Sequence, residues 1–93
     1  MDNTGVFGNN NDISIKLFPN PNRGIFKIDI NNIQGYCFVQ IFNYSGIKVF
    51  QEKFGSFEAL KLKTFSLLDF PKGIYLIKLS FEDRIISDKL IIE

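Results

Sequence analysis

The stretch CFVQIFNYSGIKVF, residues 37–50, decides the fold class. Along residues 37–42, successive side chains suit opposite faces, which is the period-two pattern of a half-buried β-strand. Asn43 and Gly46 then frame a tight turn, because glycine tolerates the positive φ that such loops need. A second alternating run follows over residues 47–53. The stretch therefore predicts an antiparallel hairpin.

Further alternating runs lie on both sides of this hairpin. Leu60 and Leu62 alternate with lysines in one of them, and Glu82 and Asp83 form a polar break that suits a tight turn between the last two. No segment sustains the apolar stripe of a helix, and residues 66–70 suit only one 3₁₀ turn before a proline. The additional predicted strands cover residues 13–18, 26–30, 60–65, 73–81 and 84–93.

Seven short strands, spaced by roughly ten residues, predict an all-β fold. We expect an immunoglobulin-like antiparallel β-sandwich of about seven strands, and a small barrel is the competing architecture. The 93 residues are enough for one domain. We assign residues 13–93 to this domain and residues 1–12, which are rich in Asn and Gly, to a flexible linker.

The composition argues against catalysis. The chain has no histidine, which removes the commonest general base and nearly all zinc-ligand patterns. Cys37 is the single cysteine and lies in an apolar run, so we expect a buried, inert thiol. Eleven basic residues against ten acidic ones are scattered singly and leave a net charge of +1. We therefore expect no enzyme, no metal, no cofactor, no nucleic-acid partner and no insertion into a membrane.

Aromatic residues are the one surplus, with eleven Phe and three Tyr but no Trp. An exposed aromatic row would suit stacking on sugars, as in a carbohydrate-binding module of a secreted hydrolase. Packing of the sandwich core accounts for the same residues, and a bare spacer module is a third possibility. The candidate rows are Phe38 with Phe42, and Phe50 with Phe54 and Phe57.

The stretch FPNPNRGIF, residues 18–26, predicts a rigid corner. Pro19 and Pro21 fix φ at about −65° and lack amide donors, while Gly24 allows the chain to reverse its direction. We expect this corner to end the first strand and to set a fixed crossing between the sheets.

Four separated blocks follow one another along the chain: LFPNPNRG at 17–24, VQIFNYSG at 39–46, PKGIYLIK at 71–78 and KLIIE at 89–93. In this order they resemble the C-terminal sorting domain, type A, of type IX secretion cargo, also known as the Por secretion system. The resemblance covers about residues 13–93. The motif and turn positions that carry it are Pro19, Asn20, Pro21, Gly24, Gly46, Pro71, Gly73 and Tyr75.

The resemblance implies a non-catalytic signal domain at the C-terminus of a periplasmic cargo protein in Gram-negative bacteria. Such domains are recognised by the type IX outer-membrane translocon, and a sortase-like peptidase usually removes them. By analogy, the cut falls in or before residues 1–12. The implied partners are the translocon, the peptidase and an N-terminal cargo domain. The implied route leads through the periplasm to the outer membrane, the cell surface or the medium.

The last strand is expected to lie at a sheet edge or to fray, which would leave backbone groups free to pair with a receptor strand. Its apolar residues would anchor such a receptor, or would simply complete the sandwich core. The candidate residues for recognition by the translocon are Lys89, Leu90, Ile91, Ile92 and Glu93.

Overall fold

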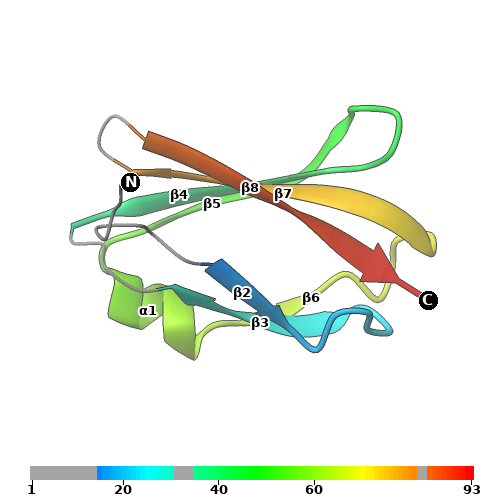
Figure 1. Ribbon diagram of the computed structural model, residues 1–93, viewed down its shortest axis with the longest axis horizontal. Helices are drawn as coiled ribbons and strands as arrows, with labels where there is room; N and C mark the ends of the chain where they lie inside the picture. Colours follow the sequence, from blue (N-terminus) through cyan, green and yellow to red (C-terminus); the bar gives the residue numbers. More distant parts are fainter. Residues whose placement is uncertain (1–14, 31–34, 82–83) are drawn as a thin grey trace, which may run out of the picture.

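A computed structural model describes residues 15–30, 35–81 and 84–93, so the predicted linker over residues 1–12 lies outside the described part. Within these ranges, seven strands form two stacked antiparallel sheets, and the chain also contains one short helix (Figure 1). The predicted all-β sandwich is confirmed. In chain order the elements are β2 (Ile15–Phe18), β3 (Ile25–Ile30), β4 (Cys37–Phe42), β5 (Lys48–Phe54), α1 (Phe57–Leu62), β6 (Thr64–Ser66), β7 (Gly73–Phe81) and β8 (Arg84–Ile92).

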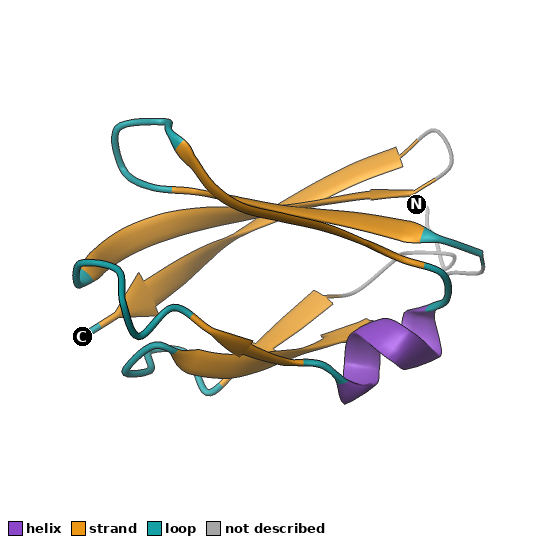
Figure 2. Cartoon of the chain, turned by 180° about the vertical axis from the view of Figure 1, so that it is seen from behind, coloured by secondary structure: helices purple, strands orange, loops and turns teal. Residues whose placement is uncertain are grey.

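The two sheets have different sizes. Three strands in the order β2-β3-β6 form one sheet, and four strands in the order β5-β4-β7-β8 form the other. All paired strands are antiparallel. Figure 2 shows the two layers from behind, with α1 at one end of the smaller layer. Strand β8 therefore lies at an edge of the larger sheet, which is one of the two arrangements expected from the sequence.

The core lies between the sheets and follows the predicted alternation. In β4 every second residue starting from Cys37 is buried, and in β3 every second residue starting from Phe26. The rings of Phe26 and Phe65 stack with their centroids 5.2 Å apart. Phe50 meets the Phe65 ring edge-on, and Phe54 meets it at a tilt. An aromatic cluster thus joins the two sheets.

The predicted strand over residues 60–65 is wrong in its first half, where the chain forms α1. Ser56 caps this helix, and its Oγ accepts a hydrogen bond from the Ala59 N–H at 3.2 Å. Leu60 is buried, whereas Leu62 is 79% exposed, so the two leucines do not share a face. The alternation of leucine and lysine resembled a strand, but the serine cap and the good helix formers behind it decide the local structure.

The connections mostly match the prediction. The β4–β5 and β7–β8 hairpins form as expected, although residues 82 and 83 are outside the described part. After β6, a single turn is closed by the Phe70 N–H, which donates to the Leu67 carbonyl at 3.0 Å.

The corner over residues 19–24 differs from its prediction. It joins β2 to β3 within one sheet, where Phe18 pairs with Lys27, so the expected crossing between sheets is wrong. The corner reverses the chain, so the strands on either side of it are antiparallel neighbours. Both peptide bonds that precede its prolines are cis.

Candidate functional site

The corner over residues 19–24 contacts the end of β8, the edge strand of the other sheet. The Asn20 side chain donates from Nδ2 to the Lys89 carbonyl at 2.9 Å. Its Oδ1 accepts from the Ile91 N–H at 3.0 Å. An asparagine amide offers the same donor and acceptor as a peptide group. The Asn20 side chain therefore provides hydrogen-bond partners for two backbone groups at the edge of β8, as a neighbouring strand would.

Asn22 adds a second set of bonds to the same edge. Its backbone N–H donates to the Ile91 carbonyl at 3.0 Å, and its carbonyl accepts from the Glu93 N–H at 2.8 Å. These two bonds form an isolated parallel bridge between Asn22 and Ile92. We refer to Asn20 and Asn22, together with residues 89–93, as the corner–tail clamp. The clamp links the two sheets along one edge of the sandwich.

The Asn22 side chain holds the corner itself in shape. Only 5% of this polar residue is exposed. Its Nδ2 donates to the Pro19 carbonyl at 2.8 Å, and its Oδ1 accepts from the Gly24 N–H at 2.7 Å. Both ends of the buried amide thus have partners, which is required of a polar group removed from water.

Gly24 closes the corner in a conformation that suits glycine. Its φ is +115°, and a Cβ at this position would lie 3.2 Å from Leu68 Cδ2 and 3.3 Å from the Leu67 carbonyl carbon. The Gly24 carbonyl accepts from the Leu67 N–H at 2.6 Å. The corner is therefore fixed on one side by the segment after β6 and on the other by β8.

The side chains of the tail, residues 89–93, point in two directions. Leu90 and Ile92 are buried in the core, with exposed fractions of 0% and 3%. Lys89 and Glu93 are exposed, and Ile91 is half-buried. Two apolar side chains of the tail thus complete the core, and the side chains of the other three residues remain at least partly accessible to solvent.

The expectation of free backbone groups along the tail is wrong where the clamp lies. The Lys89 carbonyl, both backbone groups of Ile91 and the Glu93 N–H are bonded to the corner. Because the outward-facing backbone groups of an edge strand belong to alternate residues, the next such groups upstream are those of Ser87 and Ile85. The tail is thus the end of an edge strand whose outward-facing backbone groups already have partners in the corner.

The motif positions around the start of β7 form a second local lock. The hydroxyl of Tyr75, which is 4% exposed, donates to the Pro71 carbonyl. A tyrosine that bonds the backbone a few residues upstream is a feature of immunoglobulin-type sandwiches. Gly73 lies between them with a φ of +149°. Because Tyr75 pairs with Leu90, this lock fixes the strand against which the tail lies.

The predicted turn before β5 is confirmed. Asn43 Oδ1 accepts from the Ser45 N–H at 3.0 Å and from the Ile47 N–H at 2.9 Å. The Gly46 N–H donates to the Asn43 carbonyl at 2.9 Å, and the φ of Gly46 is +86°. All of these bonds lie within the turn.

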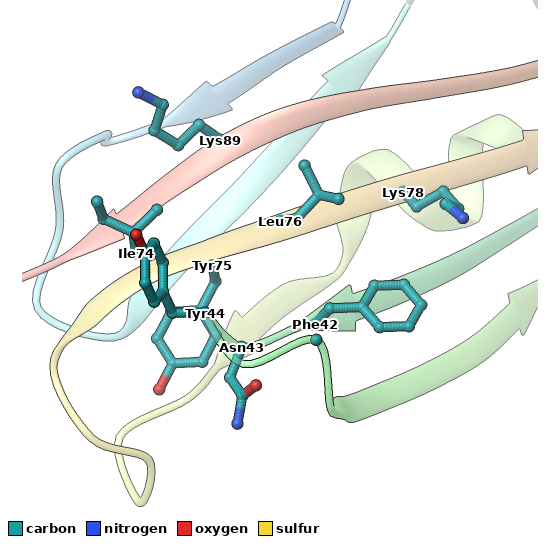
Figure 3. A pocket seen from close by; sticks show the side chains of 9 residues that line it. Phe42, Asn43, Tyr44, Ile74, Tyr75, Leu76, Lys78 and Lys89 are labelled. Atoms are coloured by element: carbon teal, nitrogen blue, oxygen red, sulfur yellow. The ribbon is translucent and has the colours of Figure 1, made fainter.

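A recess of about 510 Å³ opens on the outer face of the larger sheet, next to the clamp. Figure 3 shows Phe42, Ile74 and Leu76 on its floor, with Lys78 and Lys89 on either side. The Lys78 Nζ lies 5.4 Å from the centroid of the Phe42 ring. The recess is therefore apolar and bordered by cations.

A family model for the secretion system C-terminal sorting domain matches residues 16–93, the region that contains the corner, the recess and the tail. The chain belongs to this family. The predicted resemblance is thus confirmed, and the family implies a C-terminal sorting signal for type IX secretion, with export toward the cell surface or medium. A search of curated proteins finds no match.

The one cysteine of the sorting domain, Cys37, is buried in β4. Burial raises the pKa of the Cys37 thiol from 9.0 to about 11, so the thiol is protonated at neutral pH. Among residues 15–30, 35–81 and 84–93, no group of three or more His, Cys, Asp or Glu side chains is placed to hold a metal ion. Within the same ranges, no helix is long and apolar enough to cross a membrane.

The sequence identified the motif positions of the sorting domain but not the residues with which they form hydrogen bonds. It named Asn20 as a motif residue, did not select Asn22, and connected neither residue to the tail. The available signal was the presence of two asparagines in one proline corner, because asparagine side chains often bond to backbone groups in turns. The partners lie 69 and 71 residues away from Asn20, so no local pattern identifies them.

Proposed function

We propose that this sorting domain is a non-catalytic signal that directs a periplasmic cargo protein through the type IX translocon. The cargo would precede the domain in the chain and would reach the cell surface or the medium. The observation that carries the proposal is the corner–tail clamp. Two family motifs far apart in sequence are bonded to each other there, which gives a receptor a folded shape to recognise rather than a loose peptide.

The tail is the proposed point of recognition. Lys89, Ile91 and Glu93 face solvent at least in part, and these side chains are available to a translocon subunit. Leu90 and Ile92 would contribute indirectly, because their burial holds the strand in register.

Removal of the signal is the second part of the proposal. A sortase-like peptidase would cut in or before residues 1–12, and residues 13–93 would be released as the sorting domain. Mass spectrometry of secreted cargo gives the new terminus directly. Cargo that retains residues 13–93 would support the alternative of a permanent spacer.

The carbohydrate-binding alternative loses one of its two aromatic rows. Phe54 is buried, and Phe50 and Phe57 pack against the core, so this row is not presented to solvent. Phe38 and Phe42 are half-buried on the outer face of β4. No specific observation favours sugar binding over the sorting function.

The test fuses the full 93-residue chain to the C-terminus of a neutral exported reporter in a strain that has the type IX system. Surface delivery is measured for the wild type and for the double variant Lys89→Ala/Glu93→Ala, which leaves the core intact. The matched control is Lys16→Ala/Glu58→Ala, at two exposed positions on β2 and α1.

We expect delivery of the wild type and the control, and loss of delivery for the tail variant. A wild-type reporter that remains in the periplasm would overturn the sorting function. Equal delivery of all three would remove the tail as the recognised part. Deletion of residues 89–93 is a less specific test, because it also removes two core side chains.

A further inference from the structure

The outer face of the larger sheet carries an unbalanced charge. Directly opposite residues of antiparallel strands share a face, and the register places four lysines on the side away from the core. No Asp or Glu of the described strands shares that side, since Glu52 is opposite the buried Val39, and Asp88 is opposite the buried Ile77. The whole chain has a net charge of only +1. The four lysines are Lys48, Lys53, Lys78 and Lys89.

Three of the four lysines on this face are in contact with aromatic or amide groups. The Lys53 Nζ lies 4.6 Å from the Tyr36 ring centroid, and Lys78 lies over Phe42. Lys48 donates to the Gln51 side chain. Neither aromatic nor amide contacts neutralise a positive charge, so the face keeps its positive potential.

Between the lysines lies exposed apolar surface. Ile74 is 44% exposed, Leu76 is 43% exposed and Tyr44 is 85% exposed. These side chains line the recess of about 510 Å³ (Figure 3). Exposed apolar side chains around a concave site, with a polar rim, are typical of a protein interaction surface. We refer to the recess together with the four lysines as the lysine face.

The outer face of the smaller sheet provides a contrast. Lys16 is opposite Asp29 there, and the Lys61 Nζ lies 3.6 Å from the same Asp29 carboxylate. Lys27 shares this side as well, so Asp29 offsets part of the positive charge there. Among the described strands, the outer face of the larger sheet carries lysines without a carboxylate and also has an apolar recess, whereas the outer face of the smaller sheet carries both signs of charge.

We propose that the lysine face binds a segment of a partner protein in which apolar side chains are flanked by aspartate or glutamate. This inference rests on the proposed sorting function, because the partner would be a protein encountered during export. The apolar side chains would fill the recess, and the carboxylates would pair with the surrounding lysines.

A protein segment fits this surface better than an anionic membrane. Recognition of acidic lipids uses clusters of about four to eight basic residues close together, whereas the lysines here are separated by aromatic and aliphatic side chains on three strands. A recess also suits the insertion of individual side chains, which is the way hot-spot residues bind.

The first test changes charge without touching the tail. The full chain, fused to the exported reporter, carries Lys48→Glu/Lys78→Glu on the lysine face. The matched control, Lys16→Glu/Lys27→Glu, makes the same change of charge on the outer face of the smaller sheet. We expect delivery to fall by roughly tenfold for the first pair, since two close charge pairs become repulsive, and to change little for the control. Thermal unfolding of each variant verifies that it is folded.

The outcomes separate the two proposals. An undelivered wild-type fusion overturns the sorting function itself. A delivered wild type with an equally delivered Lys48→Glu/Lys78→Glu variant overturns the lysine face and leaves the sorting function standing.

The second test identifies the chemistry of the partner. A photoreactive phenylalanine replaces Leu76 in the recess or, as the control, Leu62, which is the exposed leucine on α1. Irradiation in living cells is followed by mass spectrometry of the crosslinked peptides. We expect the Leu76 position alone to give a peptide that combines apolar residues with a net negative charge. Lipid adducts, a basic peptide, or equal yields at both positions would overturn the inference.

Discussion

Two asparagine turns in this domain use the same side-chain chemistry for different purposes. Asn43 accepts hydrogen bonds from residues two and four positions away and stabilises only its own hairpin. Asn20 bonds with residues 69 and 71 positions away and holds the end of the edge strand. The comparison shows that one turn motif in this domain also holds tertiary structure. The corner should therefore be more sensitive to substitution than the hairpin.

The largest difference is expected between the glycines of the two turns. Gly24→Ala should lower the free energy of unfolding by about 3 kcal/mol, because the positive φ and the close backbone contacts both oppose a Cβ. Gly46→Ala meets open space and should lose only about 1 to 2 kcal/mol. Urea unfolding of both variants measures the difference, and equal losses would contradict the special role of the corner.

A second effect, the dependence of stability on pH, should not distinguish the two turns, because it arises from Cys37 in β4. The unfolded thiol ionises near pH 9, whereas the folded thiol ionises near pH 11. Between these values the unfolded state binds fewer protons, so stability should be unaffected by this group below pH 9 and fall by about 2 to 3 kcal/mol up to pH 11. Unfolding measured from pH 8 to 11 tests this, and Cys37→Ala should lose that part of the decline. An unchanged pH profile in Cys37→Ala would show that other groups cause it.

Asn22→Ala is expected to cost about 2 kcal/mol, since it leaves the Pro19 carbonyl and the Gly24 N–H without partners in a largely buried place. Asn43→Ala is the matched control, and its exposed turn should lose less than about 1 kcal/mol because water replaces the side chain. Denaturant unfolding ranks the two. A larger loss for Asn43→Ala would reverse the comparison.

Asn20→Ala should have the smallest effect on global unfolding, about 1 kcal/mol, because its bonds to the tail are exposed. Its local effect should be clearer. Loosening of the strand end should raise the rate of carboxypeptidase trimming of the 93-residue chain by roughly fivefold, the factor that corresponds to this loss. Trimming at the wild-type rate would show that the clamp does not protect the tail.

Much of the sandwich could be predicted from the sequence because its signals are local. Alternation predicts which side chains of β3 and β4 are buried, and the Asn43 turn depends on residues within the turn. The prediction failed at α1, where Leu60 and Leu62 alternate as in a strand while the Ser56 cap favours a helix. A short helix gives little periodicity, so the cap was the better signal.

The candidate site could be predicted only in part, because its contacts depend on the register between distant strands. The motif residues of the corner and tail were identified, but their bonds to each other span most of the chain. The lysines were scattered singly in the sequence, and only the pairing of β5, β4, β7 and β8 gathers four of them on one face. The pairing of distant strands, rather than any local residue pattern, creates both the corner–tail clamp and the lysine face.

Amide hydrogen exchange at Ile91 tests the central claim most directly, because its N–H donates to the Asn20 side chain. The measurement compares the wild type with Asn20→Ala and Asn43→Ala under conditions where all three are folded. The account predicts that exchange at Ile91 becomes faster in Asn20→Ala and stays at the wild-type rate in Asn43→Ala. Unchanged protection of Ile91 in Asn20→Ala, or equal acceleration in both variants, would contradict the claim that the corner holds the tail.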